Sequence, residues 1–314
     1  IDADPDNPLF ELGIAGREYY REKAAQLRDA GTDIDLFEGG ILRLAVGAVE
    51  VERYKEAVAW QRQHGHRVEW LDPVEVQAEF PWAGQCDGAL LAPHDGSVDP
   101  VKVVTAFRRG ARAAGARFEA DRAVRLVTEG GRVVAVEGTK GRYSGDQVLL
   151  AAGAWSGRIE GLPRPLSVEP VRGQMLARPW PEKVPPAIVY GSAGYVLHRG
   201  GEALCGATME HAGFDPTVTA EGEREVAAAT NLLVPALASL PTVRRWAGLR
   251  PGTPDGLPIF GREPRLANLW YATGYGRNGI LLAGITAVAL GHLLDEEATF
   301  EGVEAMRPDR FWSW

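Results

Sequence analysis

Residues 274–279, which read GYGRNG, follow the spacing G-x-G-x-x-G. The pattern before and after them predicts a strand over 269–273 and a helix over 280–294. Glycines let a ligand approach the backbone closely, and a helix N-terminus offers free N–H groups with partial positive charge. The turn therefore predicts binding of an electron-rich group. A nicotinamide-type pyrophosphate site is disfavoured, because residues 301–314 contain no convincing returning strand.

Arg250 is the second residue whose setting suggests chemistry. It follows the apolar segment 246–249 (WAGL) and precedes the rigid turn 251–256 (PGTPDG). A guanidinium at the end of a buried strand needs an anionic partner, because its burial is otherwise costly. Two partners remain open: an internal carboxylate such as Asp255, or a substrate carboxylate held by two parallel hydrogen bonds.

Metal and hydrolase sites find no support in the sequence. The histidines have no metal-ligand spacing on a predicted helix, and His64-Gly65-His66 is interpreted as a solvated turn. Ser156 lies in the sequence GAWSG, which lacks the nucleophile elbow G-x-S-x-G, so it is interpreted as a helix cap. We therefore expect no bound metal and no side chain acting as a catalytic acid or base.

Composition narrows the class of protein further. The 314 residues carry a formal net charge of −8, and such an acidic balance argues against nucleic-acid binding. Two cysteines, Cys86 and Cys205, cannot form a disulfide framework, which favours a cytoplasmic setting. The longest apolar stretch, 279–294, is too short and too rich in Gly and Ala for a bilayer span, so we expect a buried helix and no membrane contact.

Helical and strand patterns alternate along the chain. Asp72-Pro73 and Asp99-Pro100 each supply a cap and a proline at the first helical position. Helices are expected over 9–30, 49–65, 101–114, 220–233 and 280–294. Strands are expected over 40–45, 117–119, 123–128, 132–137, 147–152, 168–177, 187–190, 194–199, 203–208, 243–249 and 269–273, with tight turns at 129–131 and 200–201.

Several segments, taken together and in order, resemble the FAD-dependent D-amino-acid oxidase superfamily, and within it the bacterial glycine oxidases of thiamine biosynthesis. The segments are 148–157 (VLLAAGAWSG), 170–175 (PVRGQM), 205–209 (CGATM), 246–261 (WAGLRPGTPDGLPIFG) and 271–284 (YATGYGRNGILLAG). The resemblance implies an α/β flavoprotein fold like that of p-hydroxybenzoate hydroxylase. An FAD-binding domain over 1–35, 93–165 and 247–314 would interleave with a substrate domain, built on an antiparallel sheet, over 36–92 and 166–246.

The resemblance also assigns roles to individual residues. The substrate carboxylate would be held by Arg250, with Arg277 as a second arginine of the substrate site and the phenol of Tyr195 as a helper. Met209 matches a residue of the pocket wall, although a core methionine remains an alternative. The flavin would contact Tyr275, Gly276, Arg277, Asn278, Gly279, Ile280 and Leu281, and the adenine half would contact the backbone of Val124.

The implied reaction is oxidative deamination of glycine or a similar small amino acid. Hydride passes from the substrate Cα to non-covalently bound FAD, the imine hydrolyses to a keto acid and ammonia, and dioxygen is reduced to hydrogen peroxide. Covalent flavin is not expected, because Cys86 and Cys205 lie away from the Arg250 region where related enzymes attach it. Alternatives are an oxidase of sarcosine, proline or D-amino acids, a dehydrogenase, or an inactive truncated binding domain, and a homo-oligomer is left open.

Members of this superfamily begin with a strand, a G-x-G-x-x-G turn and a helix that hold the adenosine diphosphate half of FAD. The present sequence has no such segment before the helix expected at 9–30. We therefore expect residues 1–314 alone to be poorly soluble and colourless. An N-terminal extension of roughly fifty residues carrying G-x-G-x-x-G should restore a soluble, yellow protein.

Overall fold

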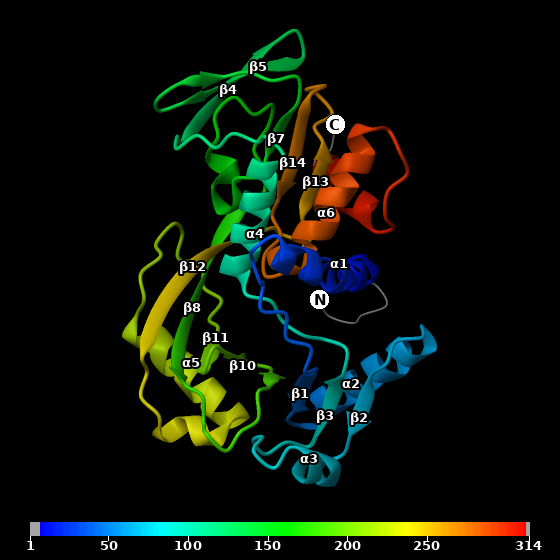
Figure 1. The fold of residues 1–314 in the computed structure, drawn as a ribbon, viewed down its shortest axis with the longest axis vertical. Helices are drawn as coiled ribbons and strands as arrows, with labels where there is room; N and C mark the ends of the chain where they lie inside the picture. Colours follow the sequence, from blue (N-terminus) through cyan, green and yellow to red (C-terminus); the bar gives the residue numbers. More distant parts are fainter. Residues whose placement is uncertain (1–6, 312–314) are drawn as a thin grey trace.

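The computed structural model describes residues 7–311 and arranges them around three β-sheets (Figure 1). The largest has eight strands in the order β12-β8-β11-β10-β9-β1-β3-β2. All neighbouring strands are antiparallel except β1 and β9. The strands are β1 (Ile41–Ala45), β2 (Glu69–Leu71), β3 (Gly88–Ala92), β8 (Glu169–Pro179), β9 (Ile188–Gly191), β10 (Gly194–Arg199), β11 (Glu202–Gly206) and β12 (Arg244–Gly252).

Helices cover the large sheet at both ends. Helix α5 (Ala220–Leu233), capped by Thr219, packs on β8 to β11, where Leu176, Val196 and Cys205 lie in one apolar core with Val226. Helix α2 (Ala48–Gln63) covers β1 and β3, and the short helix α3 (Pro73–Glu79) follows β2. The turn at 200–201 joins β10 to β11. Both of its glycines adopt the positive φ that such a tight hairpin requires.

The other half of the molecule holds the two smaller sheets (Figure 1). They comprise β13 (Ile259–Arg262), β14 (Leu269–Thr273) and β7 (Val148–Leu150), and β4 (Ala123–Glu129), β5 (Arg132–Gly138) and β6 (Arg142–Tyr143). Helix α1 (Phe10–Asp29) lies against α6 (Gly279–Leu294), with α4 (Pro100–Ala113) beside α1. The contact is close: a Cβ on Gly16 would lie 2.4 Å from the carbonyl oxygen of Leu281.

The short 3-10 helices are η1 (Gly153–Arg158), η2 (Pro235–Ser239), η3 (Val303–Met306) and η4 (Pro308–Phe311). Ser156 lies inside η1 rather than at its start, so its interpretation as a helix cap is wrong. Its buried hydroxyl instead shares a 2.7 Å hydrogen bond with that of Thr273, at the end of β14. In the described part of the chain, no helix combines the length and the hydropathy needed to cross a bilayer.

Most predicted elements are present within a few residues of their expected ends, and helix 220–233 and strand 269–273 match in full. The strand expected over 117–119 is wrong, because those residues are exposed and irregular with no neighbouring strand. Strands β2, β3, β6 and β13 were not predicted. Strand β12 pairs with β8 along its whole length and so crosses the predicted domain boundary at 246/247. The division into two interleaved domains remains a prediction.

Candidate active site

One row of residues runs across the large sheet and forms a single face. Directly paired residues point to the same side of a sheet, so the register places them together. The side chains of this row are half-buried, and its one glycine is buried, whereas the neighbouring positions Val189, Val196 and Cys205 are fully buried in the core under α5. The face turned away from α5 therefore carries, in order, Arg43, Tyr190, Tyr195, Gly206, Met175 and Trp246.

Two glycines on this face make room for the side chains that could do chemistry. A Cβ on Gly206 would lie 2.6 Å from the ring of Tyr195, and one on Gly173 would lie 2.1 Å from the guanidinium of Arg250. Gly173 lies two residues along β8 from Met175, on the same side. The guanidinium of Arg250 thus lies directly over the backbone of β8, beside the row.

Arg250 has no carboxylate partner among residues 7–311. Its Nη1 donates to the carbonyl oxygen of Thr208 at 3.1 Å and approaches the Met209 sulfur at 3.6 Å, while no acceptor in the described chain bonds to Nε or Nη2. Asp255, the internal partner left open above, instead pairs with Arg310 at 2.7 Å. That alternative is therefore wrong, and the N–H groups of Arg250 Nε and Nη2 are available to an anion.

The electrostatics of Arg250 favour such an anion. Burial lowers the pKa of this guanidinium, and the nearby charge of Arg277 lowers it further. An arginine side chain stays protonated in proteins, so the lowered pKa means that this positive charge is poorly solvated. A bound carboxylate would relieve both effects.

Tyr195 and Tyr190 stack beside this arginine, with ring centroids 5.1 Å apart. Burial, with a smaller contribution from Tyr190, raises the pKa of Tyr195 to about 12, so its phenol stays protonated near neutral pH. The guanidinium of Arg43 lies over the Tyr190 ring at 5.3 Å from the centroid. The Tyr195 hydroxyl has only the weak acceptor Met175 Sδ, at 3.6 Å, among the described atoms, so it can donate to a ligand.

The glycine turn 274–279 lies next to Arg250. The N–H of Gly276 donates to the carbonyl oxygen of Pro251 at 2.8 Å, which ties the turn to the end of β12. Gly274 and Gly276 both have positive φ, and a Cβ on Gly276 would meet nothing within 4 Å. The predicted strand–turn–helix is confirmed, with β14 before the turn and α6 after it.

This turn fits the flavin half of FAD. The first-turn N–H groups of α6 belong to Gly279, Ile280 and Leu281, and no side chain caps that end of the helix. An uncapped helix N-terminus beside an open glycine backbone suits a planar, electron-rich group such as the flavin ring. Tyr275 lies half-buried in the turn, and its hydroxyl is buried.

The structure brings most of the predicted site residues together. Arg250, Tyr195 and Met209 lie beside the turn that carries Arg277. Met209 is 67% exposed, so the core-methionine alternative is wrong. Val124 lies on a different sheet, in a bulge of β4, where its carbonyl accepts from the Glu160 N–H at 2.9 Å. Its contact with the adenine half of FAD remains a prediction.

Sequence reasoning missed Tyr190 and Arg43. Each sits in a short apolar strand whose partner lies far along the chain, so neither the stacking with Tyr195 nor the shared face could be read locally. Segment 41–45 does contain a local signal, because Arg43 lies between the buried residues Leu42 and Leu44. Segment 188–191 contains none, because Tyr190 simply follows two buried residues.

Comparisons with known proteins agree with this geometry. A family model described as FAD dependent oxidoreductase (DAO) matches residues 2–293. The glycine oxidase of Pseudomonas aeruginosa is 33% identical over 287 residues, which cover 88% of this chain and 77% of that protein. The glycine oxidase of Bacillus licheniformis is 31% identical over an alignment of 318 positions, which covers 98% of this chain and 84% of that protein.

Solved structures give the same result. The crystal structure of glycine oxidase from Geobacillus kaustophilus matches with a TM-score of 0.92 at 29% identity, covering 98% of this chain and 84% of that one. The expected α/β flavoprotein fold and the resemblance noted from the sequence motifs are therefore confirmed. A match of this extent means that the chain belongs to the DAO family of FAD-dependent oxidoreductases, with FAD as its cofactor.

Proposed function

We propose that this protein oxidises a small amino acid, with glycine or sarcosine as the first candidates, and passes the electrons to dioxygen. The family and its relatives make the chain an FAD-dependent amino-acid oxidoreductase. The observation that carries the finer proposal is Arg250, a partly buried cation beside the flavin turn whose Nε and Nη2 bond to no acceptor within residues 7–311. Such a group suits one substrate carboxylate held by two hydrogen bonds.

The residues of the site would act by binding and orientation. FAD, when bound, supplies the oxidant that accepts two electrons from the substrate. Arg250 and the Tyr195 hydroxyl would hold the carboxylate, which fixes the Cα of the amino acid relative to the turn 274–279. Tyr195 suits a hydrogen-bond donor rather than a base, because a phenol with a pKa of about 12 gives up its proton too rarely near neutral pH.

The test is peroxide production by the FAD-loaded enzyme with glycine, sarcosine, L-proline and D-alanine as substrates. The proposal expects turnover with a small substrate, with one peroxide formed per amine consumed. Reduction of an electron-accepting dye without peroxide would make the protein a dehydrogenase. No oxidation of any of these amines would contradict the proposal.

Replacing Tyr195 by phenylalanine should raise KM for the amino acid more than it lowers kcat. The loss of one hydrogen bond to a charged group costs about 1.5–3 kcal/mol, and the Tyr190 stack keeps the ring in place. Steady-state kinetics with the preferred amine measure it. An unchanged KM together with a lower melting temperature would instead assign Tyr195 a structural role.

Replacing Gly173 by alanine should displace the Arg250 guanidinium and so weaken substrate binding. The added Cβ would lie about 2 Å from that guanidinium, and Gly173 does not have a positive φ, so the backbone itself tolerates alanine. The expected result is a raised KM in a folded, FAD-containing protein. The matched control is Gly110→Ala on α4, where a Cβ meets nothing within 4 Å. Equal KM values in the two variants would contradict the placement of Arg250.

A further inference from the structure

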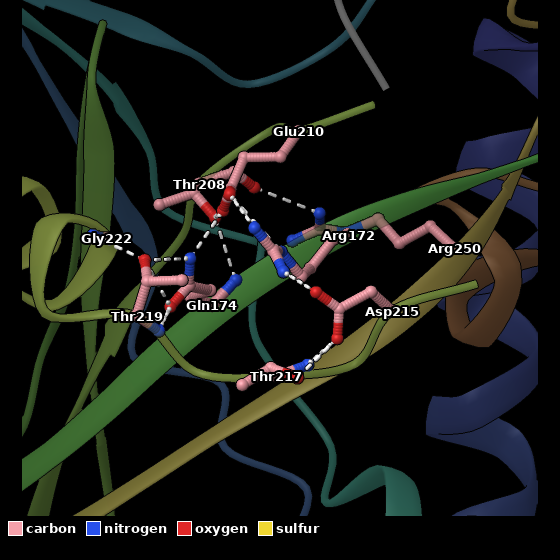
Figure 2. A network of polar contacts seen from close by, with 9 residues as sticks. All are labelled: Arg172, Gln174, Thr208, Glu210, Asp215, Thr217, Thr219, Gly222 and Arg250. Atoms are coloured by element: carbon pink, nitrogen blue, oxygen red, sulfur yellow. Dashed lines mark hydrogen bonds and ion pairs between the residues drawn. The ribbon is translucent and has the colours of Figure 1, made fainter. Parts of the chain in front are cut away.

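Arg172 and Gln174 alternate with Val171 and Gly173 along β8, so their side chains point to the face opposite Arg250. There they form a polar network with Thr208, Glu210 and Asp215 (Figure 2). Arg172 donates to Glu210 Oε2 at 2.5 Å and to Asp215 Oδ2 at 2.9 Å. Gln174 Nε2 donates to Glu210 Oε1 at 2.7 Å, and its Oε1 accepts the N–H of Thr219 at the start of α5. The site described above uses none of these side chains.

Glu210 is the centre of this network. It accepts hydrogen bonds from Arg172, Gln174 and the hydroxyl of Thr208. Burial would raise the pKa of Glu210, but these three donors outweigh it, and the pKa lies below its usual value. The carboxylate is therefore charged near neutral pH. The Glu210 charge in turn compensates that of Arg172, which is only 7% exposed and would be costly to bury without an anionic partner.

The network reaches the active site through Thr208. The Thr208 side chain bonds to Glu210, and its hydroxyl also accepts the N–H of Gln174 at 2.9 Å. The backbone carbonyl of the same residue accepts from Arg250 Nη1 at 3.1 Å (Figure 2). Thr208 is 1% exposed, so it has little room to move. The position of this carbonyl decides which N–H edges of Arg250 remain for a substrate.

The segment that carries Thr208 and Met209 is also held at its far end. Asp215 accepts from Arg172 and from the N–H of Thr217 at 2.9 Å. Phe214 packs against Trp155 of η1, with ring centroids 5.8 Å apart. Residues 207–219 are thus fixed to β8, to α5 and to η1. Arg250 donates its hydrogen bond to this fixed segment.

We propose that Glu210 is a positioning residue for carboxylate binding: by holding Thr208, it fixes the carbonyl that orients Arg250 toward the substrate. This inference rests on the proposed function, in which Arg250 binds the amino-acid carboxylate. Glu210 itself touches neither substrate nor cofactor. Its effect should therefore appear in binding, with the chemical step unchanged.

The experiment compares Glu210→Gln, Thr208→Val and Thr208→Ser in the FAD-loaded enzyme. Glu210→Gln removes the charge at nearly constant volume, and Thr208→Val removes the hydroxyl at constant shape. Both should raise KM for the amino acid and Kd for glycolate, measured by calorimetry, by about tenfold, with kcat within about twofold, the scale of one hydrogen bond to a charged group. Thr208→Ser keeps the hydroxyl and should behave as the wild type.

The matched control is Glu223→Gln, which breaks the neighbouring ion pair with Arg245, 2.6 Å, without touching Thr208. It should leave KM and the glycolate Kd unchanged. Wild-type KM and Kd in folded Thr208→Val would overturn the inference, and this variant decides if Glu210→Gln does not fold. A wild-type enzyme that oxidises no amine and binds no glycolate would overturn the proposed function, and this inference with it.

Discussion

Arg250→Ala in the FAD-loaded enzyme is expected to lose about 2–5 kcal/mol of substrate binding, the range for removing one partner of a buried charge pair. The loss should be large because the Arg250 guanidinium lies over Gly173 beside Tyr195, where its Nε–H and Nη2–H groups bond to no acceptor within residues 7–311. Steady-state kinetics should show kcat/KM reduced by the factor that corresponds to this free energy, while FAD content and the melting temperature stay close to wild type.

Arg250→Lys should recover only part of that loss. A single ammonium group cannot form the planar pair of hydrogen bonds that a guanidinium gives a carboxylate. The matched control is Arg245→Ala on the same strand, whose side chain pairs with Glu223 at the surface and should leave kcat/KM unchanged. An unchanged kcat/KM in Arg250→Ala would assign this arginine a structural role.

Gly274→Ala is expected to weaken FAD binding by at least about tenfold. Its φ is +75°, a conformation that costs an L side chain about 1–2 kcal/mol. A Cβ there would also lie 2.6 Å from Thr253 Cγ2 and 3.3 Å from the backbone nitrogen of Ile259. The turn must therefore shift, and the first-turn N–H groups of α6 shift with it. Titration of the apoprotein with FAD, followed by flavin fluorescence, measures the Kd.

The control for this variant is Gly291→Ala in the same helix. A Cβ on Gly291 meets nothing within 4 Å, and alanine in a helix interior is favoured over glycine by about 0.5–1 kcal/mol. Gly291→Ala should therefore melt higher and bind FAD as the wild type does. FAD affinity unchanged in Gly274→Ala would show that this turn does not hold the flavin.

The sequence predicted best those elements that are determined by residues close together in the chain. Asp72 and Asp99 cap helices that begin at the following proline, because a cap acts within three residues of itself. Turn 200–201 was equally local. The strand over 117–119 failed because a β-like pattern needs a neighbour to pair with, and the sequence alone does not supply one.

In the candidate site, too, local features could be predicted from the sequence and contacts between distant segments could not. Arg250 and the glycine turn stand out in the sequence, since each combines a special residue type with a local motif. The face shared by Arg43, Tyr190 and Tyr195 depends on the register of strands from distant parts of the chain. Whether Arg250 pairs with Asp255 could not be decided either, because Arg310, which takes Asp255 instead, lies 55 residues further along.

A crystal structure of the FAD-loaded protein with bound glycolate tests the role of Arg250 most directly. We expect both carboxylate oxygens within about 2.7–3.2 Å of donors on Arg250 and of the Tyr195 hydroxyl, with the hydroxymethyl carbon facing the flavin beside residues 274–279. Glycolate bound elsewhere, or Arg250 paired with a carboxylate of the protein itself, would contradict the proposed site.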